Sequence, residues 1–417
     1  MPATQQARKP TETAFPSRHG ACPEAWEPLL KPLRPLLMGR EFPNKQLCDA
    51  FGHGLLRGDP PMDTLLDWMQ AEGMANTRPL FKQALDKGID TIPDAPKPLK
   101  DFFAIIDSKP AWLDEALLER GAEAYAMMGG DVFYASRDFV LMGGYLSSSI
   151  NEVLYRAGGL DRGANRRVAE TAQWYYEMTG RGSLQRFAPG FKSTIHVRFV
   201  HALIRKRITN QDDWDVAADG IAVNQTDMVG TWLGGTIGAF IGSLLLGRLT
   251  VSYPDIKAAM HLGKYSHWLM GVEEEFLTDD PIEAAYRLAN LVMMQPGPTD
   301  VCLTMAQALA EQPMQTEYAR FAELRRRWKR YTHLSRNRFF LGKRAMQQLG
   351  LPTHIPGWYP MLGLPPKAAL SFGRRFLLPG QRAALARRGR AEQRRLVDEV
   401  YGSQHRAINP EAVASHS

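Results

Sequence analysis

Twenty consecutive residues between Met228 and Gly247, MVGTWLGGTIGAFIGSLLLG, contain no charged side chain. Their number matches the length of a membrane span. Glycine recurs every four residues from Gly230 to Gly242, so one helix face has almost no side chains and permits close approach by a second helix or a flat ligand. The Gly, Thr and Ser content weakens membrane insertion. We therefore predict the central buried helix of a bundle, with a transmembrane span as the alternative.

Helical patterns also dominate the rest of the sequence. Asn224, with Asp227 three positions later, resembles the capping box of a helix N-terminus. Segments such as DTLLDWMQAEG, AWLDEALLERGAEAYAMM and PIEAAYRLANLVMM place apolar residues three and four apart. Hydrophobic residues make up 44% of the 417 residues, enough for a substantial core. We expect an all-α fold, with one large helical domain over residues 22–351.

The two ends of the sequence differ from this middle part. Residues 1–21 are polar and lack the apolar region of a secretion signal, so we expect a flexible leader and a cytoplasmic protein. Residues 352–417 form a basic tail interrupted by Pro and Gly. Such a tail either makes peripheral contact with an anionic membrane, or packs its aromatic residues on the body while its arginines stay solvated. Because the remainder is close to neutral, a nucleic-acid partner is not expected.

The sequence lacks the motifs that are typical of several classes of enzyme and cofactor-binding protein. The three cysteines, Cys22, Cys48 and Cys302, form neither CxxC nor CxxCH, which argues against a disulfide framework and covalent c-type haem. The sequence contains no HExxH, GxxxxGK[ST] or GxSxG and no GxGxxG after a strand. Zincin, P-loop, α/β-hydrolase and Rossmann functions therefore lose their main support.

Two further helical stretches place polar residues among apolar ones. In RVAETAQWYY, Arg167 and Thr171 share one helix face with Glu170. In HVRFVHALIR, His201 lies on a mainly apolar face, with Arg198 three residues before it. A buried polar group needs a partner. His201 is therefore either a core residue paired within the protein or a metal ligand.

The order and spacing of these motifs carry a family resemblance. The arginine–threonine pair, the arginine–histidine pair and the later stretch WDVAADGIAVNQTDMVGT, from Trp214 to Thr231, resemble the latex clearing protein family of rubber oxygenases. The same broad family includes fungal oxygenases of the endoplasmic reticulum that cleave a prenyl side chain. The similarity covers roughly residues 93–351.

The resemblance implies a globin-like core around one non-covalent haem b, and cleavage of an isoprenoid carbon–carbon double bond with dioxygen as co-substrate. His201 matches the proximal iron ligand, and Arg198 matches the arginine one turn before it in the cofactor site. Arg167 and Thr171 match the polar pair on the helix over the haem. These matches would explain why polar side chains interrupt two apolar helix faces.

Three departures from the family pattern bear on mechanism and substrate. Glu170 stands where the latex-clearing members carry a lysine that can occupy the sixth iron position, so we expect an open or water-bound position. The base of the family lies in the region SSSINEVLY, where Glu152 is one residue away from the expected register, occupied by Asn151. Glu170 is the other candidate base. Without a secretion signal, the expected partner is a small or membrane-dissolved hydrophobic substrate.

Two other functions stay open at this point. One is a non-enzymatic, membrane-associated helical protein in which residues 228–247 insert or pack and the basic tail contacts lipid. The other is a haem carrier or sensor without turnover. The sequence leaves the oligomeric state undetermined.

Overall fold

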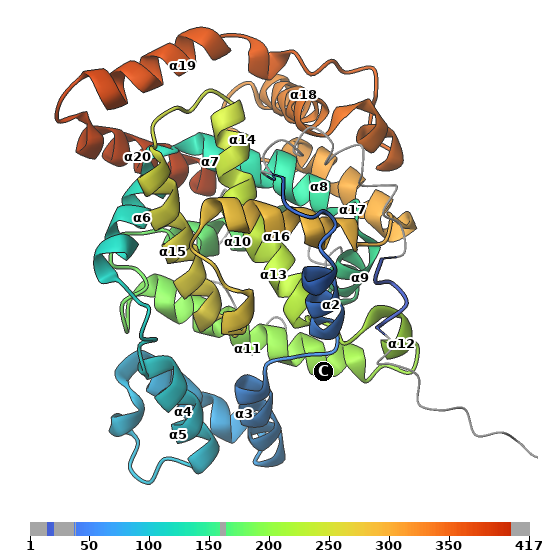
Figure 1. The fold of residues 1–417 in the computed structure, drawn as a ribbon, viewed down its shortest axis with the longest axis vertical. Coiled ribbons are helices and arrows are strands. Elements are labelled where there is room, and N and C mark those ends of the chain that lie inside the picture. Colours follow the sequence, from blue (N-terminus) through green and yellow to red (C-terminus); the bar gives the residue numbers. More distant parts are fainter. Residues whose placement is uncertain (1–14, 21–36, 38, 159–163, 402–417) are drawn as a thin grey trace, which may run out of the picture.

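A computed structural model gives the fold of the chain (Figure 1). It describes residues 15–20, 37, 39–158 and 164–401, without the side chains of residues 164–167 and 401. Throughout these ranges the regular elements are helices, and none is a β-strand. The prediction of an all-α fold is confirmed.

Nineteen α-helices, labelled α2 to α20, follow one another along the described chain. Their bounds are α2 Lys45–Gly54, α3 Pro60–Ala71, α4 Met74–Lys87, α5 Lys97–Asp107, α6 Glu115–Met127, α7 Gly130–Ala135, α8 Met142–Gly144, α9 Ser148–Arg156, α10 Ala164–Met178, α11 Pro189–Thr209, α12 Val216–Asp219, α13 Gln225–Leu233, α14 Ala239–Leu245, α15 Tyr253–Leu269, α16 Pro281–Met293, α17 Asp300–Glu311, α18 Ala322–Gln348, α19 Leu364–Phe372 and α20 Gln381–Tyr401. Three π-helical segments cover Ser136–Leu141, Gly234–Gly238 and Gly373–Leu377.

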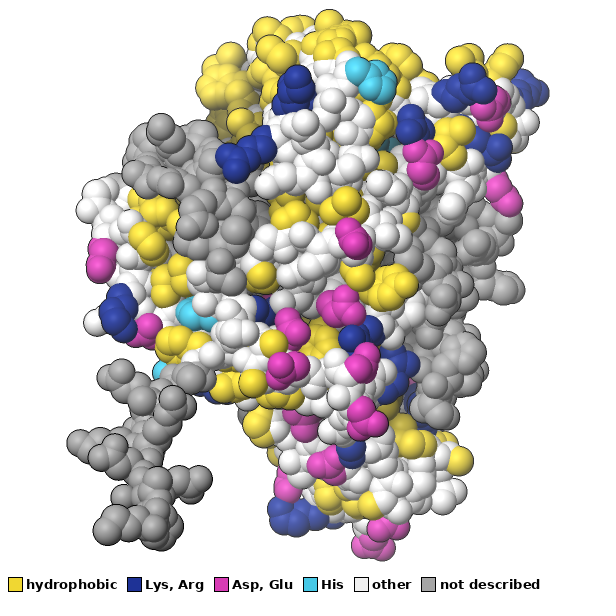
Figure 2. Space-filling model, turned by 90° about the vertical axis from the view of Figure 1, so that its right-hand side faces the viewer, with side chains coloured by type: hydrophobic (Ala, Val, Ile, Leu, Met, Phe, Trp, Pro, Cys, Tyr) yellow, Lys and Arg dark blue, Asp and Glu magenta, His cyan; other side chains and the backbone are white. Residues whose placement is uncertain are grey.

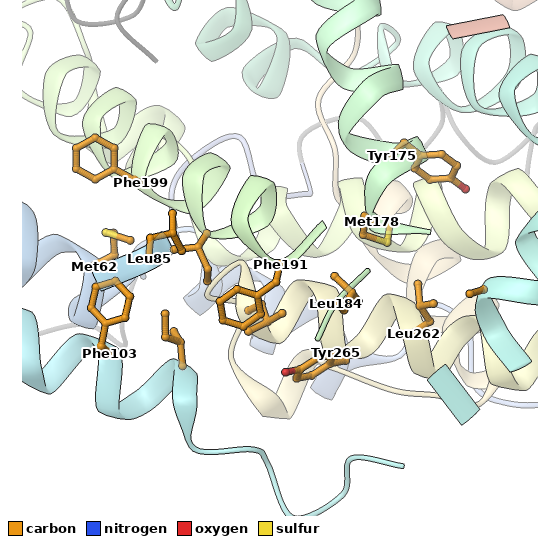
Figure 3. Packing of buried hydrophobic residues seen from close by; sticks show 14 of the residues in the cluster. Met62, Leu85, Phe103, Tyr175, Met178, Leu184, Phe191, Phe199, Leu262 and Tyr265 are labelled. Atoms are coloured by element: carbon orange, nitrogen blue, oxygen red, sulfur yellow. The ribbon is translucent and has the colours of Figure 1, made fainter. Parts of the chain in front are cut away.

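The helices form a central body with a smaller group at each end. In Figure 1, α3, α4 and α5 lie at one end, and α19 lies at the opposite end above α14 and α20. One cluster of buried side chains runs from the α3–α5 group through α11 into the body. Figure 3 shows Phe103 of α5 and Phe199 of α11 in this cluster, together with Tyr175 of α10. Helix α11 therefore joins the small group to the body.

The uncharged stretch forms α13, the π-helix Gly234–Gly238 and α14 in the middle of the body (Figure 1). By length and composition the helix Gln225–Leu245 could cross a membrane, but 67% of its most apolar window is buried within the protein. The Asn224 side chain accepts a hydrogen bond from the Asp227 backbone N–H at 2.9 Å and donates one to Asp227 Oδ2 at 2.8 Å. The predicted helix N-terminus is confirmed.

The glycine-rich face of this helix packs against protein. A Cβ atom at Gly242 would lie 2.7 Å from the Cβ of Ala135, and one at Gly234 would lie 2.9 Å from a methyl group of Val140. Both neighbours belong to the α7 region that precedes α8. The glycines thus allow two helices to touch closely, and they do not form a wall for a flat ligand.

Described parts of the predicted leader and of the predicted basic tail are attached to the body. Within the leader, Arg18 is buried and forms an ion pair of 2.8 Å with Asp227. In the C-terminal segment, α20 packs along α6 and α10. Gln393 is buried there and donates to the Tyr125 carbonyl at 2.7 Å. From Leu364 to Tyr401 the segment that was expected to be an interrupted tail consists mainly of docked helices.

Candidate functional site

Helix α11 carries His201 into the interior. Its first residue, Pro189, suits the start of a helix because its nitrogen needs no hydrogen-bond acceptor there. His201 is half-buried, and its Nδ1 atom is buried with no hydrogen-bond partner among the described residues. Burial and the nearby charge of Arg205 lower the pKa of His201 to about 4, against an opposing effect of Asp59. The imidazole is therefore neutral at neutral pH and keeps a lone pair for a ligand.

Arg198, one turn before His201, is held by protein groups. Its Nε and Nη2 atoms donate to the two carboxylate oxygens of Asp59, each at 2.6 Å, and its Nη1 donates to the Leu269 carbonyl at 3.1 Å. Arg198 and Asp59 are 4% and 3% exposed. Because Asp59 immediately precedes α3 and Leu269 ends α15, this arginine ties three elements together one turn from His201.

Arg205, one turn after His201, makes a similar attachment. Its Nη2 donates to Asp63 Oδ1 at 2.9 Å and its Nη1 donates to the Val223 carbonyl at 2.7 Å. The two arginines thus fix α11 on both sides of the histidine. Their other consequence is electrostatic, since the Arg205 charge helps to keep the His201 ring neutral.

A second buried histidine, His267 on α15, lies close enough to His201 for the two rings to influence each other's charge. Its Nδ1 is 2.9 Å from the Gly263 carbonyl, and burial lowers its pKa to about 4. The ring centroids of Trp174 and Trp232 are 6.1 and 5.9 Å from that of His267. Two indoles and a second neutral imidazole therefore lie next to the His201 region.

Two hydrogen bonds join α10 to its neighbours near these rings. Trp174 Nε1 donates to Thr194 Oγ1 of α11 at 3.2 Å, and the Tyr175 hydroxyl donates to the Gly235 carbonyl at 3.0 Å. They bring α10, α11 and the π-helix after α13 together at one level of the body.

Accessible positions lie one turn from these bonds on α10 and α13. Thr171 is four residues before Tyr175 and is exposed. Thr231 is four residues before Gly235 and is also exposed. A Cβ atom at Gly235 would meet nothing within 4 Å. Helix α10, helix α13 and the π-helix that follows α13 therefore carry accessible, weakly polar positions near these bonds.

The other residues expected in the site are placed as follows. Arg167 lies on α10 one turn before Thr171, but its side chain is outside the described residues. Glu170 is half-buried next to Thr171 and has an interaction partner. Glu152 accepts from Arg156 Nε at 2.8 Å on the surface of α9. None of the described contacts brings Glu152 to His201, so its role as a base stays a prediction.

Asn151 occupies the register in which the family base was expected. It is 1% exposed and its side-chain nitrogen donates to the Gly144 carbonyl at 2.9 Å and to the Ser147 carbonyl. An amide with these bonds has no basic lone pair to offer. Its position helps to hold α9 against the segment that follows α8.

His267, Trp174, Trp232 and Asp59 were missed as site residues by sequence reasoning. His267 carries the same signal as His201, a polar ring on an apolar helix, and could have been found by it. Asp59 gave no such signal, because its partner Arg198 is 139 residues away in the sequence.

The donor set excludes one kind of centre and suits another. No group of three His, Cys, Asp or Glu side chains that could hold a metal ion occurs among the described residues. A metal site built from protein ligands alone needs such a group. A haem brings four nitrogen ligands of its own and needs one axial side chain from the protein. A neutral imidazole whose Nδ1 has no partner among the described residues suits that need.

Comparisons with known proteins cover the part of the chain that contains this site. Residues 128–372 match the sequence model described as the catalytic domain of the ER-bound oxygenase mpaB/B′ and rubber oxygenase family. A rubber oxygenase of Streptomyces sp. (strain K30) is 27% identical over 205 residues, which are 47% of this chain and 46% of that protein. The chain thus matches about half the length of this relative.

A solved structure of latex clearing protein in its closed state has a similar fold. The TM-score is 0.62 at 18% sequence identity, over 82% of this chain and 91% of the other. Both α11, with His201, and α13, with Thr231, lie inside the residues matched by the family model.

Proposed function

Because the chain belongs to the ER-bound oxygenase mpaB/B′ and rubber oxygenase family, we propose that it is a haem b-dependent oxygenase that cleaves a carbon–carbon double bond. The proposal rests on the environment of His201. This imidazole is kept neutral by burial, and its buried Nδ1 has no hydrogen-bond partner among the described residues.

The residues around His201 fit a haem. His201 would hold the iron, and the side chains of Trp174, Trp232 and His267 would provide the flat, largely apolar surroundings that a porphyrin requires. The bound group would supply an iron centre that activates dioxygen. Gly235 leaves room on the inner face, because no described atom occupies the place of its missing side chain.

The protein's own contribution is position, charge and the exclusion of water. Arg198 and Arg205 hold α11 through buried or half-buried ion pairs, so His201 cannot rotate away with its helix. Thr171 offers a hydroxyl that can donate to or position an oxygen substituent. Trp174 and Trp232 keep bulk water from the interior end of the site.

Proton transfer has two candidate groups. Both have partners in the structure, Glu152 through its ion pair with Arg156 at 2.8 Å, but Glu170 is the one adjacent to Thr171 on α10. A base must reach within hydrogen-bonding distance of the proton that it removes. Glu170 is therefore the more economical assignment if the reaction needs a base.

The substrate class follows from the family and from the inner surface. Threonine, glycine and indole groups offer few charges to a ligand, which suits an uncharged, unsaturated hydrocarbon. We propose an isoprenoid or lipid-like compound that is small or dissolved in a membrane, and a cytoplasmic location at or near that membrane. The further proposal is that both products carry a carbonyl group at the cleaved carbons.

Oxygen uptake by haem-loaded protein tests this function. We would supply short polyisoprenes, squalene and prenylated phenols, and detect carbonyl products by mass spectrometry. Thr171→Val should lower turnover more than haem content. Thr304→Val on α17 is the matched control, because Thr304 is also an exposed helical threonine and its hydroxyl donates to the Asp300 carbonyl at 2.9 Å.

Two results would contradict the proposal. A haem-loaded protein that consumes no oxygen with any of these compounds would instead be a carrier or sensor. Equal loss of activity in the Thr171 and Thr304 variants would remove Thr171 from the site.

A further inference from the structure

The segment from Tyr359 to Leu378 points polar side chains inward and apolar side chains outward. On α19, the Lys367 ammonium forms an ion pair of 2.7 Å with Asp131, and Ser371 is buried and donates to the Gly247 carbonyl at 3.0 Å. On the π-helix that follows, Arg375 reaches Asp255 at 3.2 Å. A helix on the surface of a globular protein normally buries its apolar face. Here this arrangement is reversed.

The outward side chains form what we call the apolar ridge. They are large hydrophobic residues with 42–71% of their surface exposed: Met361, Leu362, Leu370, Phe372, Phe376, Leu377 and Leu378. Figure 2 shows hydrophobic side chains gathered at the end of the molecule where Figure 1 places α19. Large contiguous apolar surface on a protein marks a place where another apolar surface binds.

The part of the sequence that contains the ridge is rich in Lys and Arg. Between Leu324 and Ala391 the sequence contains sixteen Lys and Arg residues and no Asp or Glu. Some of these cations are paired with acids elsewhere in the body, as Lys367 and Arg375 are. Arg387 and Arg388 are exposed on α20, roughly 10 Å along the helix from its start, and Arg388 also lies 3.4 Å from Glu392. Cations therefore flank the apolar ridge on its α20 side.

We propose that the apolar ridge docks on an anionic lipid bilayer, with its leucine and phenylalanine side chains inserted shallowly and the α20 arginines at the headgroups. Exposed apolar residues next to basic ones are the combination that binds such a surface. The ion pairs of Lys367 and Arg375 hold the ridge to the body. Docking of the ridge would therefore fix the orientation of the whole protein on the bilayer.

A second copy of the chain suits the apolar ridge less well as a binding partner than a bilayer does. In a symmetric dimer the same patch meets itself. Contact between two ridges would then bring two basic segments together, and residues 324–391 of neither copy contain an acid that could pair with the other copy. Like charges across an interface oppose binding. An anionic bilayer supplies the opposite charge and an apolar layer at once.

Co-sedimentation with vesicles tests the proposal and needs neither haem nor substrate. The full-length protein should bind vesicles of phosphatidylcholine with phosphatidylglycerol, and should bind phosphatidylcholine alone much more weakly. Phe376→Ser with Leu377→Ser should lower the partition coefficient about tenfold or more. Arg387→Gln with Arg388→Gln should lower it about fivefold for each arginine, and rising salt should have a similar effect.

The control variant is Leu56→Ser with Ile105→Ser, two residues outside the ridge that are 46% and 40% exposed. It should bind vesicles like the unchanged protein. A second measurement does not depend on serine substitutions: a fluorophore at Leu378→Cys should be quenched by brominated lipid, and one at Ile105→Cys should not.

Three outcomes would overturn the proposal. One is the absence of binding to anionic vesicles by folded protein. Another is equal binding by the ridge variant and the control variant. The third is a dimer in sedimentation velocity that the Phe376/Leu377 substitutions dissociate, since this would assign the ridge to a second copy of the chain.

Discussion

Replacing Asp59 with asparagine should cost the protein ~3–5 kcal/mol of unfolding free energy, because it leaves the Arg198 charge buried without a counter-charge. The two side chains are 3% and 4% exposed, and two bonds of 2.6 Å join them. An asparagine has the same shape, but it would turn an NH₂ group towards one of the arginine donors. The bond from Arg198 to the Leu269 carbonyl is present before and after the substitution, so it does not offset the loss of the counter-charge. Urea denaturation followed by circular dichroism measures the change.

The matched control is an exposed ion pair between the same two helices, α3 and α11. Asp67 of α3 pairs with Lys206 of α11 at 2.5 Å, with side chains that are 65% and 39% exposed. Asp67→Asn should cost ~0–1 kcal/mol, because an exposed ion pair contributes little. The double variant Asp59→Leu with Arg198→Met should recover much of the loss, since it leaves no buried charge. The reasoning is refuted if Asp59→Asn costs no more than Asp67→Asn.

Two further predictions concern pH and the glycine face. Burial lowers the pKa of His201 and of His267 to about 4 from an ordinary 6.5, so the unfolded chain binds protons in this range that the folded chain does not. These two groups should not change the free energy of unfolding above pH 6.5. As the pH drops from 6.5 to 4, that free energy should fall, by ~3 kcal/mol for His267. Denaturation of the His267→Phe variant over the same pH range should show a correspondingly smaller loss. Gly242→Ala should lower stability by ~1–3 kcal/mol, because its Cβ would lie 2.7 Å from that of Ala135. Gly235→Ala, which meets nothing within 4 Å, should instead raise the melting temperature through a gain of ~1 kcal/mol in helix propensity.

Local patterns in the sequence were sufficient to predict several helices and the start of one of them. The spacing of apolar residues predicts α3, α6 and α16, and the Asn224–Asp227 pair predicts the start of α13, because these features depend on residues within one or two turns. His201 was found because a polar ring interrupts an apolar face. Its interpretation as an iron ligand came from the family resemblance.

Features that depend on distant parts of the chain could not be predicted in this way. The partner of Arg198 is Asp59, and nothing in the local pattern of either residue indicates the other. The C-terminal segment is a similar case. One of the two alternatives placed its arginines in solvent and its aromatic residues on the body, but Arg375 pairs with Asp255 whereas Phe376 is 42% exposed. Composition gives the charges of a segment, and tertiary contacts decide which side of it is buried.

The visible absorption spectrum of His201→Gly, purified with haem in excess, tests most directly whether this imidazole holds an iron porphyrin. We expect the unchanged protein to bind one haem with the spectrum of a histidine-ligated iron. The variant should lose that spectrum and regain it when free imidazole is added, while His196→Gly on the same helix α11 should leave it unchanged. A His201→Gly protein that keeps the same haem content and spectrum, or an unchanged protein that stays colourless, would contradict the proposed site.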